Sequence, residues 1–268
     1  MKIFLLALSV SISTTLFAQV KDTLISVGQH SLNFRIIQGI GRPIVFESGA
    51  GNDGSVWKDI MLLLAKRTKA PLIAYDRAGF GKSGINTAYI KIENEVNDLS
   101  SALAQLGYDT DYFFVAHSLG SSYAMKFAQD KPNKVAGSVF IDVVNPYYLT
   151  AEKARHIKNQ FIDSLETIKK ESIGFYYLIL NYEDTGNVMR QSAQAYKTPT
   201  TVIASGLTPF EGDERCKFIA GLKKFAEEHD NRNYILLKDA EHFVFYDEPE
   251  FVTDEIISLY KTVKDTNR

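Results

Sequence analysis

The chain has 268 residues, of which 45% are hydrophobic and 23% are charged, and its formal net charge is −2. This length and composition suit one large domain with a sizeable buried core. The small net charge gives no global field that favours nucleic acid or an anionic membrane, so we expect neither as a partner.

The first eighteen residues differ in kind from the rest. Lys2 is followed by the apolar run Ile3–Val10 and then by a Ser/Thr-rich stretch that ends at the small residue Ala18. One positive charge, a short apolar run and a small residue are typical of a secretory signal peptide, and the run is short for a bilayer span. We therefore expect removal of residues 1–18 near Ala18, a mature chain without a membrane span, and a periplasmic or secreted protein.

After this leader, strand-like and helix-like segments alternate along the chain, beginning with an antiparallel pair of strands. The predicted strands are Thr23–Val27, Ser31–Ile37, Pro43–Glu47, Pro71–Asp76, Asp111–Ala116, Val135–Asp142, Thr200–Ser205 and Asn233–Lys238. The predicted helices are Ser55–Arg67, Tyr89–Leu106, Leu119–Asp130, Asp213–His229 and Pro249–Val263. Strands separated by helices of this length predict an α/β fold, a mostly parallel sheet covered on both faces.

One interval, residues 145–198, shows helical periodicity and no strand. It contains the charged segment Ala151–Lys170 and the aromatic run Phe175–Tyr182. An insertion of this kind between two strands is typical of a helical cap over the carboxyl edge of the sheet, where open α/β folds bind ligands. We therefore predict a core of residues 19–144 and 199–268 with a cap of residues 145–198.

Ser118 lies between a predicted buried strand and a predicted helix, in the run Ala116-His117-Ser118-Leu119-Gly120. Small residues two positions either side let strand and helix approach closely enough for a tight turn. Such a turn pushes the serine hydroxyl out above the sheet, as in the nucleophile elbow G-x-S-x-G, here with alanine in the first position. Ser118 is therefore the candidate nucleophile.

A serine hydroxyl needs a base to take its proton, and the base needs a carboxylate to orient it. His242 follows the last predicted strand by a short polar loop, so we expect it at the same sheet edge as Ser118. Asp142 closes the strand after the elbow and is the favoured carboxylate. Asp213 and Glu211, which follow the next strand, remain alternatives.

A tetrahedral intermediate also needs backbone N–H donors. The glycine-rich loop after Pro43–Glu47 offers Ala50, and the residue after the serine offers Leu119. We expect Glu47 to make surface hydrogen bonds and the Asp76–Ser83 run to brace neighbouring loops. The spacing of histidine, cysteine and carboxylate residues predicts no metal site.

Taken in chain order, Ser48–Gly51, Asp76–Ser83, Ala116–Gly120, Asp142 and His242 resemble the α/β-hydrolase superfamily of serine esterases and lipases. The resemblance implies an eight-stranded sheet, a Ser-acid-His triad and no cofactor. Many members carry the acid after the strand that follows the cap, and a minority carry it where Asp142 stands. The elbow departs from the glycine-rich form of proline iminopeptidase-like members, and a serine in place of the dehalogenase aspartate argues against that chemistry.

The resulting hypothesis is an exported serine hydrolase that cleaves a small or medium carboxylic ester. An aminopeptidase acting on an amide is an alternative, and it needs a carboxylate in the cap to pair with the substrate ammonium. A ligand-sensing relative with little turnover is another. The single cysteine, Cys216, excludes an internal disulfide, and we expect it to be buried in a helix. The candidate cap carboxylates are Glu152, Glu166, Glu171, Glu183 and Asp184.

Overall fold

A computed structural model describes residues 20–109 and 111–263 of the chain. The predicted signal peptide, residues 1–18, lies outside the described residues. Within them, the strands form one eight-stranded sheet in the spatial order β1-β2-β4-β3-β5-β6-β7-β8. The strands are β1 (Lys21–Ser26), β2 (Ser31–Ile37), β3 (Ile44–Glu47), β4 (Leu72–Tyr75), β5 (Tyr112–His117), β6 (Val135–Ile141), β7 (Thr200–Leu207) and β8 (Arg232–Glu241).

The sheet is parallel from β4 to β8, and the first two strands are added to it in antiparallel fashion. The central strands β3 to β6 are buried along their whole length. This is why they read as continuous apolar runs rather than as alternating patterns. The predicted α/β fold class is confirmed, with an antiparallel opening pair as expected.

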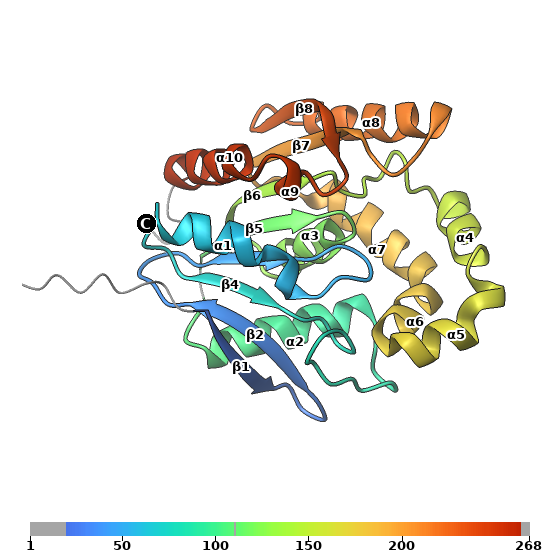
Figure 1. Cartoon of the computed structure of the whole chain (residues 1–268), viewed down its shortest axis with the longest axis horizontal. Helices are drawn as coiled ribbons and strands as arrows, with labels where there is room; N and C mark the ends of the chain where they lie inside the picture. Colours follow the sequence, from blue (N-terminus) through green and yellow to red (C-terminus); the bar gives the residue numbers. More distant parts are fainter. Residues whose placement is uncertain (1–19, 110, 264–268) are drawn as a thin grey trace, which may run out of the picture.

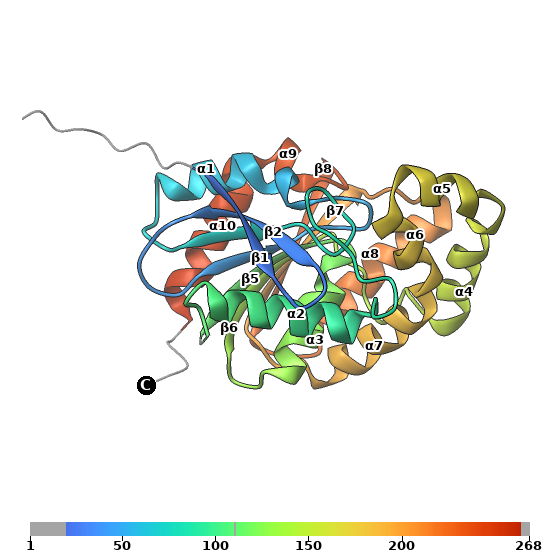
Figure 2. The ribbon, with the colours of Figure 1, turned by 90° about the horizontal axis from the view of Figure 1, so that it is seen from below.

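Helices cover both faces of the sheet, and each face has its own apolar core (Figures 1 and 2). One core includes side chains of α2, α3 and α8, and the other includes side chains of α1, α9 and α10. The helices of the core region are η1 (Gly54–Trp57), α1 (Lys58–Ala65), α2 (Ile92–Gln105), α3 (Gly120–Asp130), α8 (Gly212–Glu227), α9 (Val244–Asp247) and α10 (Pro249–Thr262).

The segment between β6 and β7 is helical, as its periodicity indicates. Its helices are α4 (Ala151–Asn159), η2 (Ile162–Ser164), α5 (Leu165–Glu171), α6 (Ile173–Leu180) and α7 (Tyr182–Ala195). We call residues 151–195 the helical insertion. In Figure 1 its helices α4, α5 and α6 lie beyond one end of the sheet, and α7 runs back beside α3. The backbone N–H of Gly174 in α6 donates to the carbonyl oxygen of Gly79, in the loop after β4, at 3.2 Å. The insertion is therefore in direct contact with a loop at the carboxyl end of the strands.

A second contact joins the insertion to the core near the start of α8. Lys153 of α4 forms an ion pair with Glu214 of α8, and the Tyr148 hydroxyl donates to the same carboxylate at 3.1 Å. Nearby on α8, Cys216 is exposed, so the expectation that it would be buried is wrong. The buried face of α8 carries Phe218, Leu222 and Phe225, and Cys216 lies outside that stripe.

Candidate active site

Ser118 occupies a sharp turn between β5 and α3. Its backbone has φ of 52°, in the left-handed region, which an L-residue adopts at a cost of about 1–2 kcal/mol. Its backbone N–H donates to the carbonyl oxygen of Ile141 in β6 at 3.1 Å. A side chain at Gly120 would place its Cβ 2.6 Å from the carbonyl oxygen of Glu47, so only glycine fits there. The predicted elbow geometry is thus present, and the turn is held by the neighbouring strands.

Asp142 and His242 meet at the same edge of the sheet. Asp142 directly follows β6, is fully buried, and has φ of 44°. Its Oδ2 accepts a hydrogen bond from His242 Nδ1 at 2.6 Å, and its Oδ1 accepts one from the backbone N–H of Ser205 at 3.0 Å. With Nδ1 donating, the ring presents Nε2 as its proton acceptor. Glu211 and Asp213 are exposed at the start of α8, and Asp142 is the carboxylate that contacts His242.

His117, the residue before the serine, also contacts His242. Its Nε2 lies 3.0 Å from the backbone carbonyl oxygen of His242, and the two rings are 4.4 Å apart between centroids. A carbonyl oxygen can only accept, so Nε2 of His117 carries the proton. Burial and the nearby His242 hold the pKa of His117 well below its usual value. His117 is therefore a neutral donor that holds the backbone of His242 beside the elbow.

The two candidate oxyanion donors come from the residue after the serine and from the loop after β3. The loop after β3 packs against the elbow, because a Cβ on Gly49 would lie 3.1 Å from the Cβ of Ser118. Within the described ranges, neither the Ala50 nor the Leu119 N–H donates to a protein acceptor. Leu119 immediately precedes α3, where the first N–H groups of a helix lack an intrahelical partner. The backbone N–H groups of Ala50 and Leu119 are thus both available to donate to a ligand at Ser118.

Under the loop after β3 lies a charged cluster. Arg77 braces this loop, as expected for the Asp76–Ser83 run, but the sequence did not indicate the carboxyl groups around it. Arg77 is buried and donates to the carbonyl oxygens of Ser48 and Gly49, at 2.5 and 2.7 Å. Glu47 is fully buried, so the expectation of surface hydrogen bonding is wrong. It accepts from the Tyr75 hydroxyl at 2.8 Å and lies 3.7 Å from the guanidinium of Arg77. Parallel pairing of β3 with β4 explains why these groups meet.

Burial raises the pKa of Glu47 to about 8, although Arg77 and the Tyr75 hydroxyl act in the opposite direction. Glu95 of α2 also belongs to this cluster, and it accepts from the Tyr123 hydroxyl at 3.0 Å. Burial raises the pKa of Glu95 to about 7, again against Arg77 and a tyrosine hydroxyl. One guanidinium is therefore flanked by two carboxyl groups that resist ionisation.

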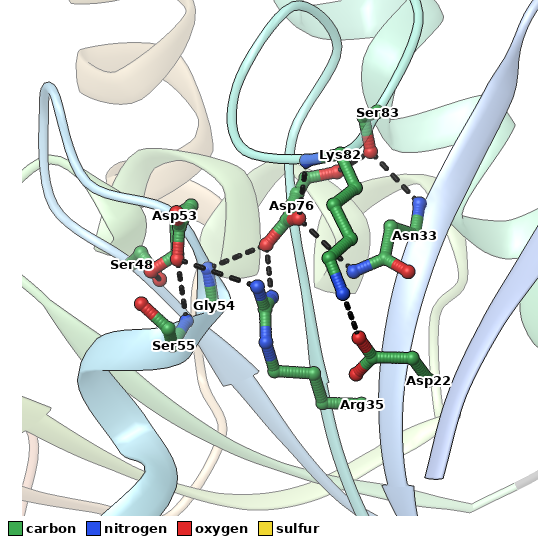
Figure 3. Close-up of polar contacts among 10 residues, drawn as sticks. All are labelled: Asp22, Asn33, Arg35, Ser48, Asp53, Gly54, Ser55, Asp76, Lys82 and Ser83. Carbon is green, nitrogen blue, oxygen red and sulfur yellow. Dashed lines mark hydrogen bonds and ion pairs between the residues drawn. The ribbon is translucent and has the colours of Figure 1, made fainter.

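Asp76 braces the loop after β3 at its far end, near Gly54 (Figure 3). Its carboxylate accepts from the backbone N–H groups of Gly54 and Lys82, each at 2.9 Å, and from the Asn33 side chain at 3.1 Å. It also forms an ion pair with Arg35. Charge-assisted bonds of this kind are the stronger ones in proteins, so Asp76 ties two loops and strand β2 into one unit.

An apolar cluster lies beside the elbow. Phe80, Leu119, Leu178 and Ile179 form its buried centre, and partly buried side chains of the insertion pack against it. Phe175 is one of these, and it also lies 3.9 Å from the position of a Cβ on Gly51. The insertion thus supplies apolar surface close to both donor loops. A separate hollow of about 680 Å³ lies at the opposite edge of the sheet, near Pro132 and Pro199, away from these groups.

Metal binding and membrane insertion are two further properties of the described residues. Among the described residues, no group of three histidine, cysteine or carboxylate side chains has a metal-binding arrangement. In the same part of the chain, no helix combines the length and hydropathy needed to cross a bilayer.

Residues 42–173 match a family model described as the alpha/beta hydrolase fold. The uncharacterised protein YqjL of Bacillus subtilis (strain 168) is 32% identical over 102 residues, which are 38% of this chain and 40% of that protein. The match thus spans about two fifths of that relative.

Solved structures align over most of the chain. A bromoperoxidase from Bacillus anthracis has a TM-score of 0.67 and 17% identity, covering 90% of this chain and all of that one. An esterase from Thermogutta terrifontis has a TM-score of 0.63 and 20% identity, covering 90% of this chain and 98% of that one. At these identities the structural likeness concerns the fold.

Proposed function

Because this chain belongs to the α/β-hydrolase superfamily, we propose that it is a serine hydrolase that cleaves a small or medium carboxylic ester. The observation that carries the proposal is the Asp142–His242 hydrogen bond at the edge where β5 ends in Ser118. A carboxylate-oriented imidazole beside an elbow serine is the arrangement that activates a hydroxyl as a nucleophile.

In the proposed mechanism, the hydroxyl oxygen of Ser118 attacks the acyl carbon while Nε2 of His242 takes its proton. Asp142 stabilises the imidazolium that forms, and the Ala50 and Leu119 N–H groups hold the oxyanion. His242 then gives the proton to the departing alcohol, which leaves an acyl-enzyme. Water, deprotonated by His242, releases the acid and restores the serine.

The surroundings favour an ester with an apolar acyl or alcohol group. The apolar cluster of Phe80, Leu119, Leu178 and Ile179 includes the proposed oxyanion donor Leu119, and apolar side chains of the insertion pack against it. The aminopeptidase alternative lacks a comparable observation. Glu183 is engaged by Arg155 and Lys158, and the other four candidates are exposed. These four are Glu152, Glu166, Glu171 and Asp184.

Labelling with a fluorophosphonate tests the proposal directly. We expect the wild type to be labelled at Ser118 and Ser118→Ala to remain unlabelled and inactive toward nitrophenyl esters. A series of acyl chain lengths, run beside aminoacyl amides, separates the two substrate classes. Ester hydrolysis that persists unchanged in Ser118→Ala would overturn the proposal, and faster turnover of aminoacyl amides would favour the peptidase. Stoichiometric capture without turnover would favour a sensing role.

We also propose that the protein is exported, on the strength of the charged and apolar pattern in residues 1–18. Mass spectrometry of protein recovered from the periplasm or medium tests this. We expect the mature chain to begin at Gln19, and an intact Met1 on cytoplasmic protein would contradict export.

A further inference from the structure

We infer that Arg77 is a positioning residue that aims the Ala50 N–H at the oxyanion, by holding the peptide unit between Gly49 and Ala50. The inference rests on the proposed function and adds to it a residue outside the Ser-His-Asp set. Arg77 does not touch the reacting atoms, and it acts only through the loop backbone that it holds.

The geometry of the peptide bond carries the first step. The carbonyl oxygen of Gly49 and the N–H of Ala50 belong to one planar trans unit, so they point in opposite directions. Arg77 Nη2 lies 2.7 Å from that carbonyl oxygen, and Nη1 lies 2.5 Å from the carbonyl oxygen of Ser48. Two bonds from one rigid guanidinium fix consecutive carbonyls. The Ala50 N–H is thereby turned away from Arg77.

Charge strengthens the same arrangement. The positive guanidinium faces the negative end of the peptide dipole, which leaves the positive end, the Ala50 N–H, for a developing negative charge. Inside a protein the effective dielectric constant is low, so such an alignment is worth more than in water. Arg77 therefore both orients the donor and polarises it.

The guanidinium itself is held on several sides. It lies 4.7 Å from the ring centroid of Tyr123 and 5.5 Å from that of Phe80, and only 2% of the residue is exposed. The Oε2 of Glu47 lies 3.7 Å from the guanidinium and takes no hydrogen bond from it, and the other oxygen of that carboxyl group accepts from Tyr75. The two nitrogens that reach the loop are thus free to hold the carbonyls, and the base of the cluster is rigid.

Gly49 itself packs closely against the elbow. A Cβ on Gly49 would lie 2.9 Å from Nδ1 of His117, so no side chain fits between the loop and the elbow at this position. The Gly49 carbonyl oxygen accepts from Arg77 Nη2 at 2.7 Å and, over a longer distance of 3.4 Å, from the Asn52 backbone N–H. Removing Arg77 therefore leaves the orientation of the Gly49–Ala50 peptide to the longer bond alone.

The test uses Arg77→Met, which keeps the length of the side chain and removes both donors, with Arg77→Lys as a milder variant. Arg232→Met is the matched control. Arg232 is also buried and also donates to two backbone carbonyls, those of Phe225 and Tyr196, but it lies at the start of β8, at the opposite edge of the sheet. We expect Arg77→Met and Arg232→Met to lower thermal stability alike.

Activity distinguishes the variants. We expect Arg77→Met to lose about 10²–10³-fold in kcat, the effect of removing one oxyanion donor, with KM little changed. Its affinity for a trifluoromethyl ketone, which forms an oxyanion on attack by Ser118, falls by a similar factor. Arg77→Lys loses less, because an ammonium can hold one carbonyl, and Arg232→Met keeps the wild-type kcat. Equal losses of kcat in Arg77→Met and Arg232→Met would overturn the inference.

A crystal structure of the variants gives a readout that needs no turnover. We expect the Gly49–Ala50 peptide to be rotated in Arg77→Met, or in Arg77→Lys if the first variant does not fold. If the Gly49–Ala50 peptide keeps its orientation in the variant, the positioning role of Arg77 is overturned, whatever the activity of that variant. A wild type that no fluorophosphonate labels contradicts the proposed function instead, and the peptide orientation still decides the role of Arg77.

Discussion

His117 Nε2 lies 3.0 Å from the carbonyl oxygen of His242, so the residue that precedes the elbow serine holds the backbone of the residue that Asp142 orients. This bond joins the end of β5 to the residue that follows β8, 125 positions further along the chain. The site is therefore assembled by contacts between loops as well as by the sheet.

Replacing His117 tests this relationship. We expect His117→Phe, which keeps a ring but loses the donor, to lower kcat by roughly 10- to 100-fold, because small misplacements of a base are costly. His117→Gln, whose amide can donate to the same carbonyl, should restore part of the activity. Since His117 is neutral near pH 7, the acidic limb of the kcat/KM profile should keep its position in His117→Gln. A profile displaced by a full pH unit would contradict this role, and the exposed His156→Phe serves as control.

Asp142→Asn tests the choice of acid. An asparagine can still accept from the Ser205 N–H, but its amide N–H₂ then faces Nδ1 of His242 and favours the wrong tautomer. By analogy with the corresponding substitution in a serine protease, we expect kcat to fall by about 10³–10⁴-fold with little change in fold. Steady-state kinetics with a nitrophenyl ester measures the loss. Asp213→Asn should behave as wild type, and the reverse pattern would move the acid to α8.

The left-handed backbone of Ser118 predicts a trade of stability for reactivity. Glycine adopts φ of 52° without the steric cost of a Cβ, so Ser118→Gly should unfold at higher urea concentration, by about 1 kcal/mol in free energy of unfolding. Ser118→Ala lacks the hydroxyl but keeps the Cβ, so it should show little of this gain. Urea titrations of both variants make the comparison. Equal midpoints would show that the turn stores no strain at this residue.

The raised pKa values of Glu47 and Glu95 predict how stability depends on pH. In the folded chain these carboxyl groups keep their protons to about pH 8 and about pH 7, whereas in the unfolded chain they lose them near pH 4.5. The folded state thus binds more protons in that window, and the free energy of unfolding falls as pH rises through it. Each group contributes at most about 1.4 kcal/mol per pH unit.

Glu95→Gln should make this fall shallower between about pH 4.5 and pH 7, as measured by denaturant unfolding at a series of pH values. Glu93→Gln, an exposed position on the same helix, is the control and should follow the wild-type curve. If the Glu95→Gln curve also runs parallel to the wild type, Glu95 ionises normally in the folded chain.

The order of strands and helices could be predicted because each buried strand is a short apolar run with turn residues at its ends. Placement of Ser118, Asp142 and His242 at strand ends followed from the same pattern. Their catalytic roles stay predictions, although Asp142 and His242 do make contact. The burial of Glu47 could not be foreseen, since its partners Tyr75 and Arg77 come from the neighbouring strand and the loop that follows it.

Glu95 was missed for a different reason. It belongs to an acidic amphipathic helix in which it looks no different from the exposed Glu93, and only the tyrosine of another helix distinguishes it. The expected burial of Cys216 is wrong because the sequence alone does not show which face of α8 meets the sheet. Both errors concern how one element faces another, which a single sequence does not encode locally.

The exposed thiol of Cys216 gives this protein a ready attachment point for a fluorescent or spin probe, without any engineered cysteine. The probe would be attached two residues from Glu214, which forms an ion pair with Lys153 of the insertion. A change in the contact between α4 and α8 would change the probe's surroundings. Whether adding an ester substrate alters this contact can therefore be measured in solution on an otherwise unaltered chain.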